Sequence, residues 1–157
     1  RSAGMPEGVI DELDVADLVD EQAHAYRFDA PSAGWVTAAV HQLASGAARF
    51  DAGRILPVGR PESFTVAPAV PPGPARLRMR TDLPAQPRAL RITVDRMGKR
   101  ISEQVFTTPA RQATHWNDAE VALPDIRGGD RITIEPLVWW RSYHYWIRRP
   151  AEDRKVR

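Results

Sequence analysis

The segment ARLRMRTDLPAQPRALRITVDRMGKRISEQVF, residues 75–106, decides the fold class of this chain. In its first part Leu77 and Met79 alternate with arginines, and residues 89–94 (ALRITV) alternate in the same way. A period of two places every second side chain on one face, so both parts are predicted to be strands with one buried face. Gly98 can then adopt the positive φ of a tight turn before RISEQVF returns as a third strand. The segment therefore predicts consecutive antiparallel strands.

Similar short segments follow one another along most of the chain. Apolar and β-branched residues cluster in them, and Gly, Pro, Asp or Asn residues separate them. The predicted strands are residues 24–29, 35–40, 47–50, 62–66, 75–81, 89–94, 100–106, 120–124, 131–135 and 137–148. The turn residues Pro31 to Gly34 predict that the first two form a hairpin. About eight to ten short strands predict an all-β chain, and we expect an antiparallel, jelly-roll-like β-sandwich.

The N-terminal residues carry a different pattern. Ile10, Leu13 and Ala16 form a rough helical stripe and Pro6 suits a first helical turn, so a short helix within residues 6–20 is expected. The valines of this segment would equally suit an extended arm. We therefore predict three parts, which are an acidic N-terminal arm or short helix (residues 1–22), a β-sandwich domain (23–149) and a basic C-terminal tail (150–157).

Composition excludes several classes of protein. The 157 residues suffice for one domain with a core, and 43% of them are hydrophobic. The absence of cysteine excludes disulfides, thiolate nucleophiles and Cys-ligated metal centres. No apolar run approaches the roughly 20 residues of a membrane-spanning helix. Because the formal net charge is only +2 and the strand arginines are the polar half of amphipathic strands, nucleic acid is not expected as a partner.

The residue patterns of common catalytic and metal sites are not found. The four histidines, His24, His41, His115 and His144, have no ligand spacing, so each is expected to be a surface or packed residue. Aspartates recur every third residue from Asp11 to Asp20, which is not the spacing of a calcium loop and indicates one polar face. There is no nucleophile elbow and no phosphate-binding glycine loop. We therefore predict no catalytic residues, no metal and no cofactor.

The stretch LVWWRSYHYWIRRP, residues 137–150, holds three of the five tryptophans. Read as one strand, it has aromatic residues on both faces, so neither face is an ordinary solvent face. Three interpretations remain open. The rings can form part of the core, they can contact a protein or a membrane surface, or they can form a platform on which sugar rings stack.

Residues 75–135 also show an ordered pattern that resembles a known type of domain. The motifs are PARLRMRTD, then ALRITVDRMGKRI with an Arg96-Met97 insertion before Gly98, then THWNDAEVALPDIRGGDRITIE. Together, over about 60 of the 157 residues, they resemble jelly-roll domains of the galactose-binding-like or carbohydrate-binding-module type. The resemblance implies a sandwich fold and a sugar-binding, accessory or assembly role. It assigns no calcium-site or sugar-site residue.

The favoured interpretation is a non-catalytic, extracytoplasmic (periplasmic or secreted) binding module, carbohydrate-binding-like or accessory, that uses an aromatic surface. The alternative is a structural subunit of a larger, possibly membrane-bound, protein assembly, docked through the aromatic C-terminal strand and the N-terminal arm. The predicted ligand-binding or docking residues are Trp139, Trp140, Arg141, Tyr143, His144, Tyr145 and Trp146, with Trp116 and Asn117 from a loop.

Overall fold

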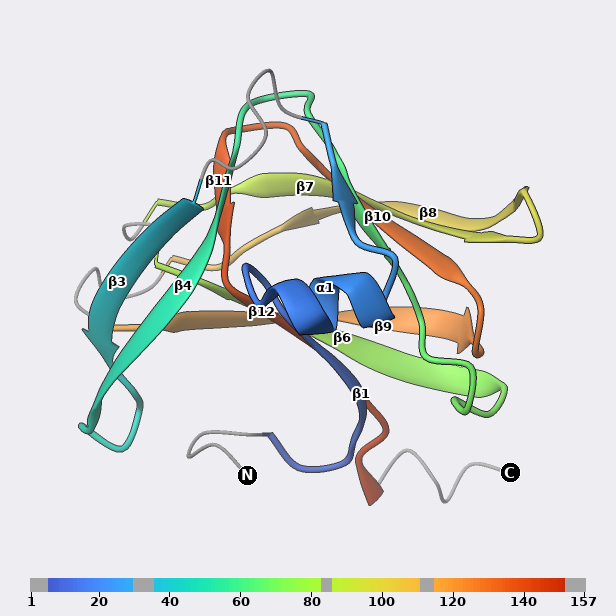
Figure 1. Ribbon diagram of the computed structural model, residues 1–157, viewed down its shortest axis with the longest axis horizontal. Coiled ribbons are helices and arrows are strands. Elements are labelled where there is room, and N and C mark those ends of the chain that lie inside the picture. Colours follow the sequence, from blue (N-terminus) through green and yellow to red (C-terminus); the bar gives the residue numbers. More distant parts are fainter. Residues whose placement is uncertain (1–5, 30–35, 83–85, 111–114, 152–157) are drawn as a thin grey trace.

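The structure is a computed structural model that describes residues 6–29, 36–82, 86–110 and 115–151. These residues form twelve strands and one short helix, and every strand pair within the sheets is antiparallel. Two sheets face each other across the core, and a smaller third sheet lies beside them (Figure 1). The all-β prediction is therefore confirmed.

Each sheet mixes strands from distant parts of the chain. The four-stranded sheet has the order β1 (Val9–Asp14), β12 (His144–Arg148), β6 (Gly73–Thr81), β9 (Asn117–Ile126). The five-stranded sheet has the order β2 (Arg27–Phe28), β5 (Glu62–Thr65), β10 (Arg131–Pro136), β7 (Ala89–Arg96), β8 (Lys99–Thr107). The three-stranded sheet has the order β11 (Trp140–Ser142), β4 (Ala48–Leu56), β3 (Val36–Gln42). Consecutive elements therefore often change sheets.

The core lies between the four-stranded and five-stranded sheets. Leu77 and Met79 of β6 are fully buried there, as the alternation predicts, and they share the core with Ile92 of β7 and Ile134 of β10. The alternate side chains of β6 are arginines that face away from the core. Burial of this apolar half, at roughly 25 cal/mol per Å² of apolar surface, provides the main stabilisation of the sandwich.

The predicted hairpin after residue 94 is confirmed. β7 and β8 pair from Arg96 and Lys99 outward, which leaves a two-residue turn. Met97 and Gly98 both have positive φ, 50° and 77°. Two such residues in succession match the right-handed twist of the flanking strands.

The N-terminal helix was predicted too early and too long. Residues 9–14 form β1, which pairs with β12, and the helix α1 spans only Leu18–Ala23. Asp17 caps that helix, because its side chain accepts hydrogen bonds from the backbone amides of Val19 and Asp20. Leu13 is buried in the sandwich core, so alternation rather than a helical stripe governs this segment. The predicted boundary at residue 22 stays a prediction, although β1 shares a sheet with β12.

The predicted hairpin of residues 24–29 and 35–40 is wrong. β2 pairs with β5, whereas β3 pairs with β4. The proposed turn and Trp35 lie outside the described residues. β3 and β4 are instead joined by a turn in which the amide of Gly46 donates to the carbonyl of Leu43. Among the residues described, no helix has the length and apolar character needed to span a membrane.

Candidate functional site

The aromatic stretch is not one strand, which corrects the sequence interpretation. β11 belongs to the three-stranded sheet and β12 to the four-stranded sheet, and Tyr143 lies between them. At this point β4 approaches the chain closely. A Cβ atom on Gly53 would lie 2.1 Å from the carbonyl oxygen of Ser142, so only glycine fits. The stretch therefore contributes one strand to each of the two sheets.

Most of its rings are inside the molecule. Trp140, Tyr143, Tyr145 and Trp146 are each at most 2% exposed. Tyr145 lies in the core and stacks on Phe64 at a centroid distance of 5.3 Å. The structure therefore places these four predicted residues where no ring face is open to a ligand. Their proposed binding role stays a prediction, and burial argues for packing.

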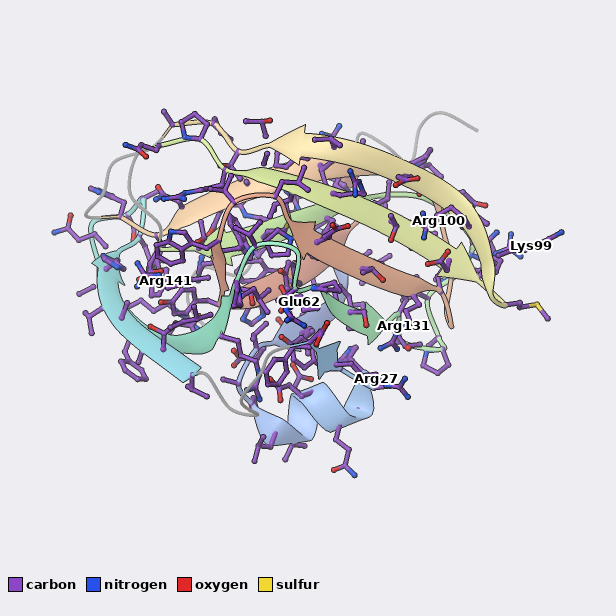
Figure 2. The ribbon with its side chains drawn as sticks, turned by 90° about the horizontal axis from the view of Figure 1, so that it is seen from above. Arg27, Glu62, Lys99, Arg100, Arg131 and Arg141 are labelled. Carbon is purple, nitrogen blue, oxygen red and sulfur yellow. The ribbon has the colours of Figure 1, made fainter. Side chains whose placement is uncertain are left out.

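A buried carboxyl group provides the hydrogen-bond partner of the buried Tyr145 hydroxyl group. Glu62 is fully buried near the centre of the molecule (Figure 2), and its Oε2 accepts hydrogen bonds from Tyr26 (2.5 Å) and Ser142 (2.9 Å). Tyr145 donates to Oε1. Burial raises the pKa of Glu62 despite these three donors. This cluster joins all three sheets and gives the hydroxyl groups structural partners.

Trp139 and Arg141 lie apart from the buried rings. Trp139 is 38% exposed, and the guanidinium groups of Arg88 and Arg141 each lie 5.3 Å from its ring centroid. Arg141 also pairs with the buried Asp82, at 2.9 Å. Two arginines against one indole form cation–π contacts that occupy much of the ring. Of the predicted residues, this pair is the most accessible.

The outer face of the four-stranded sheet carries a row of stacked side chains. The guanidinium of Arg80 lies 4.8 Å from the ring centroid of Trp146, which stacks on His144 at 4.1 Å. On its other side Arg80 lies 5.8 Å from Trp116. Arg80 was predicted to face outward, and it does, yet it is only 2% exposed. The row is buried because neighbouring elements cover it.

One end of this row opens into a pocket of about 320 Å³, the Trp116 pocket, formed by the turn after β3 and the outer face of β6 and β9. Its lining residues are Leu43, Ala44, Arg78, Arg80, His115, Trp116, Asn117 and Asp118. The indole nitrogen of Trp116 donates to the carbonyl of Arg49 at 2.9 Å, which fixes the ring under β4. The pocket thus contains both residues predicted in a loop, although Asn117 begins β9, and Trp116 also contacts the ring of Tyr143 at a centroid distance of 4.7 Å.

Ion pairs organise the polar wall of the Trp116 pocket. Arg80 binds both oxygens of Asp118, at 2.8 and 2.9 Å, in a bidentate pair. Arg78 approaches the same carboxylate with longer contacts of 3.1 and 3.3 Å. Its Nη1 atom lies 4.0 Å from Glu120, beyond hydrogen-bond distance. Arg78 is therefore the more loosely held of the two arginines.

The other end of the row opens into a second, acidic pocket of about 320 Å³. Its lining residues are Glu12, Asp14, Asp17, Val19, Asp20, Arg49 and His144. Three of the regularly spaced aspartates line it, whereas Asp11 points elsewhere and binds His24 and the amide of Ala67. Sequence reasoning missed Asp51, which lies beside Asp14 and His144. Only the pairing of distant strands brings these residues together, so spacing carried no signal.

His24 links the acidic N-terminal elements. Its two ring nitrogens lie 2.9 Å from Asp11 Oδ1 and 2.8 Å from the carbonyl oxygen of Asp20. Both partners are acceptors, so the doubly protonated ring fits best. The hydrogen bond with Asp11 raises the pKa of His24 to about 9. This packed histidine agrees with the prediction for the four histidines.

Comparison with solved structures identifies the fold of the chain. No protein-family model matches the chain, and no curated protein matches its sequence. Among solved structures it resembles CsCBM6-3 from Clostridium stercorarium in complex with cellobiose, with a TM-score of 0.55, 9% identity and coverage of 94% of this chain and 99% of that one. It also resembles Xyl-CBM35 in complex with a glucuronic acid-containing disaccharide, with a TM-score of 0.56, 15% identity and coverage of 89% and 94%.

A third similar structure is the exo-β-1,3-galactanase Pc1,3Gal43A E208Q from Phanerochaete chrysosporium, with a TM-score of 0.53 and 10% identity. The match covers 90% of this chain but only 29% of the galactanase chain. At these identities the likeness concerns the fold. The chain therefore has the jelly-roll β-sandwich fold that these carbohydrate-binding modules share, which confirms the predicted fold class and the fold-level resemblance.

Proposed function

We propose that this chain is a non-catalytic module that binds carbohydrate in the Trp116 pocket. Sugar rings combine apolar C–H faces with hydroxyl groups, so their sites need an apolar wall beside fixed polar groups. The Trp116 pocket has both, because Leu43 and the 6% exposed Trp116 adjoin the Arg78 and Asp118 pair. This juxtaposition is the observation that carries the proposal.

Arg78 is the residue best suited to contact a ligand. Its side chain is 33% exposed, whereas that of Arg80 is 2% exposed and held by Asp118 in a bidentate pair. A guanidinium has five N–H donors, and the Nη1 group of Arg78 makes no short contact with Glu120. A sugar hydroxyl or carboxylate can therefore accept hydrogen bonds from Arg78 without breaking the ion pair between Arg80 and Asp118.

The proposal moves the binding surface away from the one predicted from sequence. Trp116 and Asn117 remain in it, while Tyr143 packs against Trp116 and Trp146 packs against Arg80. The fold shared with carbohydrate-binding modules supports the non-catalytic role. An extracytoplasmic location belongs to the same proposal, since polysaccharides are encountered there.

Isothermal titration calorimetry against a panel of soluble polysaccharides and their oligosaccharides tests the proposal. One glycan should bind, and Arg78→Ala should weaken that binding at least tenfold. Arg131→Ala is the matched control, because Arg131 lies on the outer face of the five-stranded sheet (Figure 2). Absence of binding to any glycan, or an equal loss in the Arg131 variant, would contradict the proposal.

Docking onto a larger assembly is a second candidate, and one observation favours it. The outer face of the β3–β4 hairpin exposes Val36, Val40 and Phe50, at 53%, 61% and 64%. Val40 and Phe50 are paired across the two strands, so the apolar side chains adjoin. Clusters of this kind mark interaction surfaces more often than scattered apolar residues do. This surface differs from the aromatic strand that the sequence indicated.

A further inference from the structure

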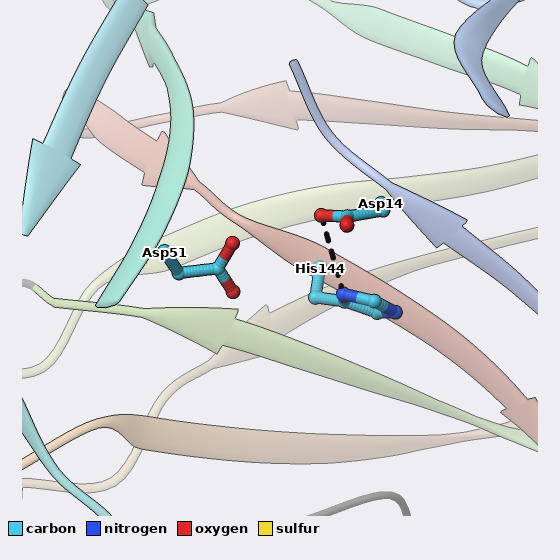
Figure 3. A group of neighbouring side chains, drawn as sticks. All are labelled: Asp14, Asp51 and His144. Carbon is cyan, nitrogen blue, oxygen red and sulfur yellow. Dashed lines mark ion pairs between the residues drawn. The ribbon is translucent and has the colours of Figure 1, made fainter. Parts of the chain in front are cut away.

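Three side chains from separate strands converge beside the acidic pocket, which two of them, Asp14 and His144, also line. Asp14 ends β1, Asp51 lies in β4 and His144 begins β12. One ligand atom from each lies within 4.8 Å of the other two. Figure 3 shows both carboxylates directed toward the space beside the imidazole ring. The three groups are the donor types that bind divalent transition metals.

Asp51 is buried, and one oxygen of its carboxylate has no hydrogen-bond partner in the described residues. It is 8% exposed, and its Oδ1 accepts one hydrogen bond, from the amide of Ala52 at 2.9 Å. Its Oδ2 is buried and has no hydrogen-bond partner within the described part of the chain. A buried, unpaired carboxylate oxygen is costly unless a cation compensates it.

His144 has one nitrogen held and one directed at the carboxylates. It is 4% exposed, and its Nε2 lies 3.3 Å from Glu12 Oε2. Its Nδ1 lies 3.5 Å from Asp14 Oδ1 and is without a hydrogen bond in the region described. Donation from Nε2–H to Glu12 leaves the Nδ1 lone pair facing Asp14 and Asp51. A carboxylate behind a histidine in this way orients metal-binding imidazoles in proteins.

We propose that Asp14, Asp51 and His144 bind one divalent transition-metal ion, with Zn²⁺ preferred, and that Glu12 is a positioning residue. Two carboxylates and an imidazole match the oxygen and nitrogen ligands of Zn²⁺. Ca²⁺ takes six to eight oxygen ligands, roughly twice the number of ligands available from these residues. The open side of the acidic pocket leaves room for water to complete the coordination.

The required movement is small. Bonds of about 2.0–2.2 Å in a tetrahedral site put neighbouring ligand atoms about 3.4 Å apart, so ligand atoms at the 4.8 Å limit must approach each other by about 1.4 Å. Asp14 can supply this movement because its side chain is 43% exposed. The bound ion would then tie β4 to β1 and β12. This goes beyond the proposed carbohydrate site, which lies at the other end of the stacked row.

Calorimetric titration of the EDTA-treated full chain with ZnCl₂ and, separately, CaCl₂ tests the site. Zn²⁺ should bind with a stoichiometry near one and should raise the melting temperature, and Ca²⁺ should bind more weakly. Asp51→Asn should reduce Zn²⁺ affinity at least tenfold. The same variant should keep or raise the melting temperature of the metal-free chain, because it removes a desolvated charge beside Asp14.

Two comparisons make the outcome decisive. Asp125→Asn is the control, because Asp125 pairs with Arg96 away from the acidic pocket, and it should bind Zn²⁺ like the unaltered chain. With Co²⁺ in place of Zn²⁺, the visible absorption spectrum should change in His144→Gln. Unchanged Zn²⁺ affinity in Asp51→Asn, tighter binding of Ca²⁺ than of Zn²⁺, or no Zn²⁺ binding at all would each overturn the proposal.

Discussion

The two outer faces of the sandwich are built from the same kind of alternating sequence, but their arginines differ in exposure. On the four-stranded sheet, Arg80 is 2% exposed and forms a bidentate pair with Asp118. On the five-stranded sheet, Arg91 is 39% exposed and lies near Glu135 and Glu103 at 3.2 and 3.5 Å. Both arginines belong to the polar half of an alternating strand. What differs is that α1 and the β3–β4 hairpin contribute to pockets over the first face.

Alternation fixes which way a side chain points, whereas burial of the polar half of a strand depends on the elements that cover it. A covered polar face must satisfy its charges internally, which explains the paired and stacked groups around Arg80. An open polar face can leave its charges to water, and its ion pairs contribute little. Recognition chemistry is therefore expected on the covered face, where polar groups are held in fixed positions.

The sharpest test of this contrast removes one acid from each face. Asp118→Ala leaves Arg80 buried without its carboxylate and should destabilise the chain by about 3–5 kcal/mol. Glu135→Ala removes an exposed partner of Arg91 and should cost about 0–1 kcal/mol. Urea denaturation midpoints of the two variants measure the difference. Equal losses would mean that the covering elements do not isolate Arg80 from water.

Displacing β4 from its position beside β11 should have the next largest effect on stability. Gly53→Ala places a methyl group against the carbonyl of Ser142 and the ring of Tyr143, and overpacking of this kind costs about 1–3 kcal/mol. Acrylamide should then quench the tryptophan fluorescence more strongly, because β4 no longer lies close to β11. Gly46→Ala serves as control. That residue has a φ of 86° and no atom within 4 Å of the added methyl, so it should lose stability without increased quenching.

The pH dependence of stability should follow the protonation of His24, which links β1 to α1. The folded-state pKa of His24 is raised from 6.5 to about 9, so its protonated form stabilises the fold. This stabilisation, on the order of 3 kcal/mol, is fully present below pH 6.5 and is lost as the pH rises toward 9. Asp11 and Asp20 are the charged groups that face the ring. Urea midpoints at pH 6 and 9.5 should differ for the native chain and much less for His24→Gln.

The smallest effect is expected where nothing covers the sheet. Phe50→Ser on the outer face of β4 should change the free energy of unfolding by no more than about 0.5 kcal/mol, because Phe50 is 64% exposed. Size-exclusion chromatography with light scattering should show the same molecular mass for both proteins. A loss of several times this size would show that Phe50 is covered in solution, for example by a second copy.

The strands that sequence predicted well are those with one apolar and one polar half. Residues 75–81, 89–94 and 131–135 all lie in β6, β7 and β10, because a single buried face leaves only one register. Sequence also placed Pro124 at a strand end, whereas β9 continues through it to Ile126. Within the described residues β9 pairs only with β6, and the register shifts near Pro124, so this edge strand tolerates the missing amide.

The aromatic stretch and the acidic pocket could not be predicted, for related reasons. With rings on both faces, the stretch carried no marker of the break at Tyr143, and only the contact with Gly53 explains it. Asp14, Asp51 and His144 become neighbours through pairing of β1 with β12 and the position of β4. Glu62, whose carboxyl joins three sheets, resembled an ordinary surface residue in sequence.

The central position of β12 has a consequence for how the chain acquires its structure during synthesis. β12 pairs with β1 on one side and β6 on the other, and 132 positions separate Glu12 from His144. Until residues 144–148 leave the ribosome, β1 has no neighbour in its sheet and the core remains open along β6. Such long-range pairing slows folding. The four-stranded sheet is therefore completed late, only after residues 144–148 have left the ribosome, and a ribosome that stalls earlier leaves an apolar edge exposed.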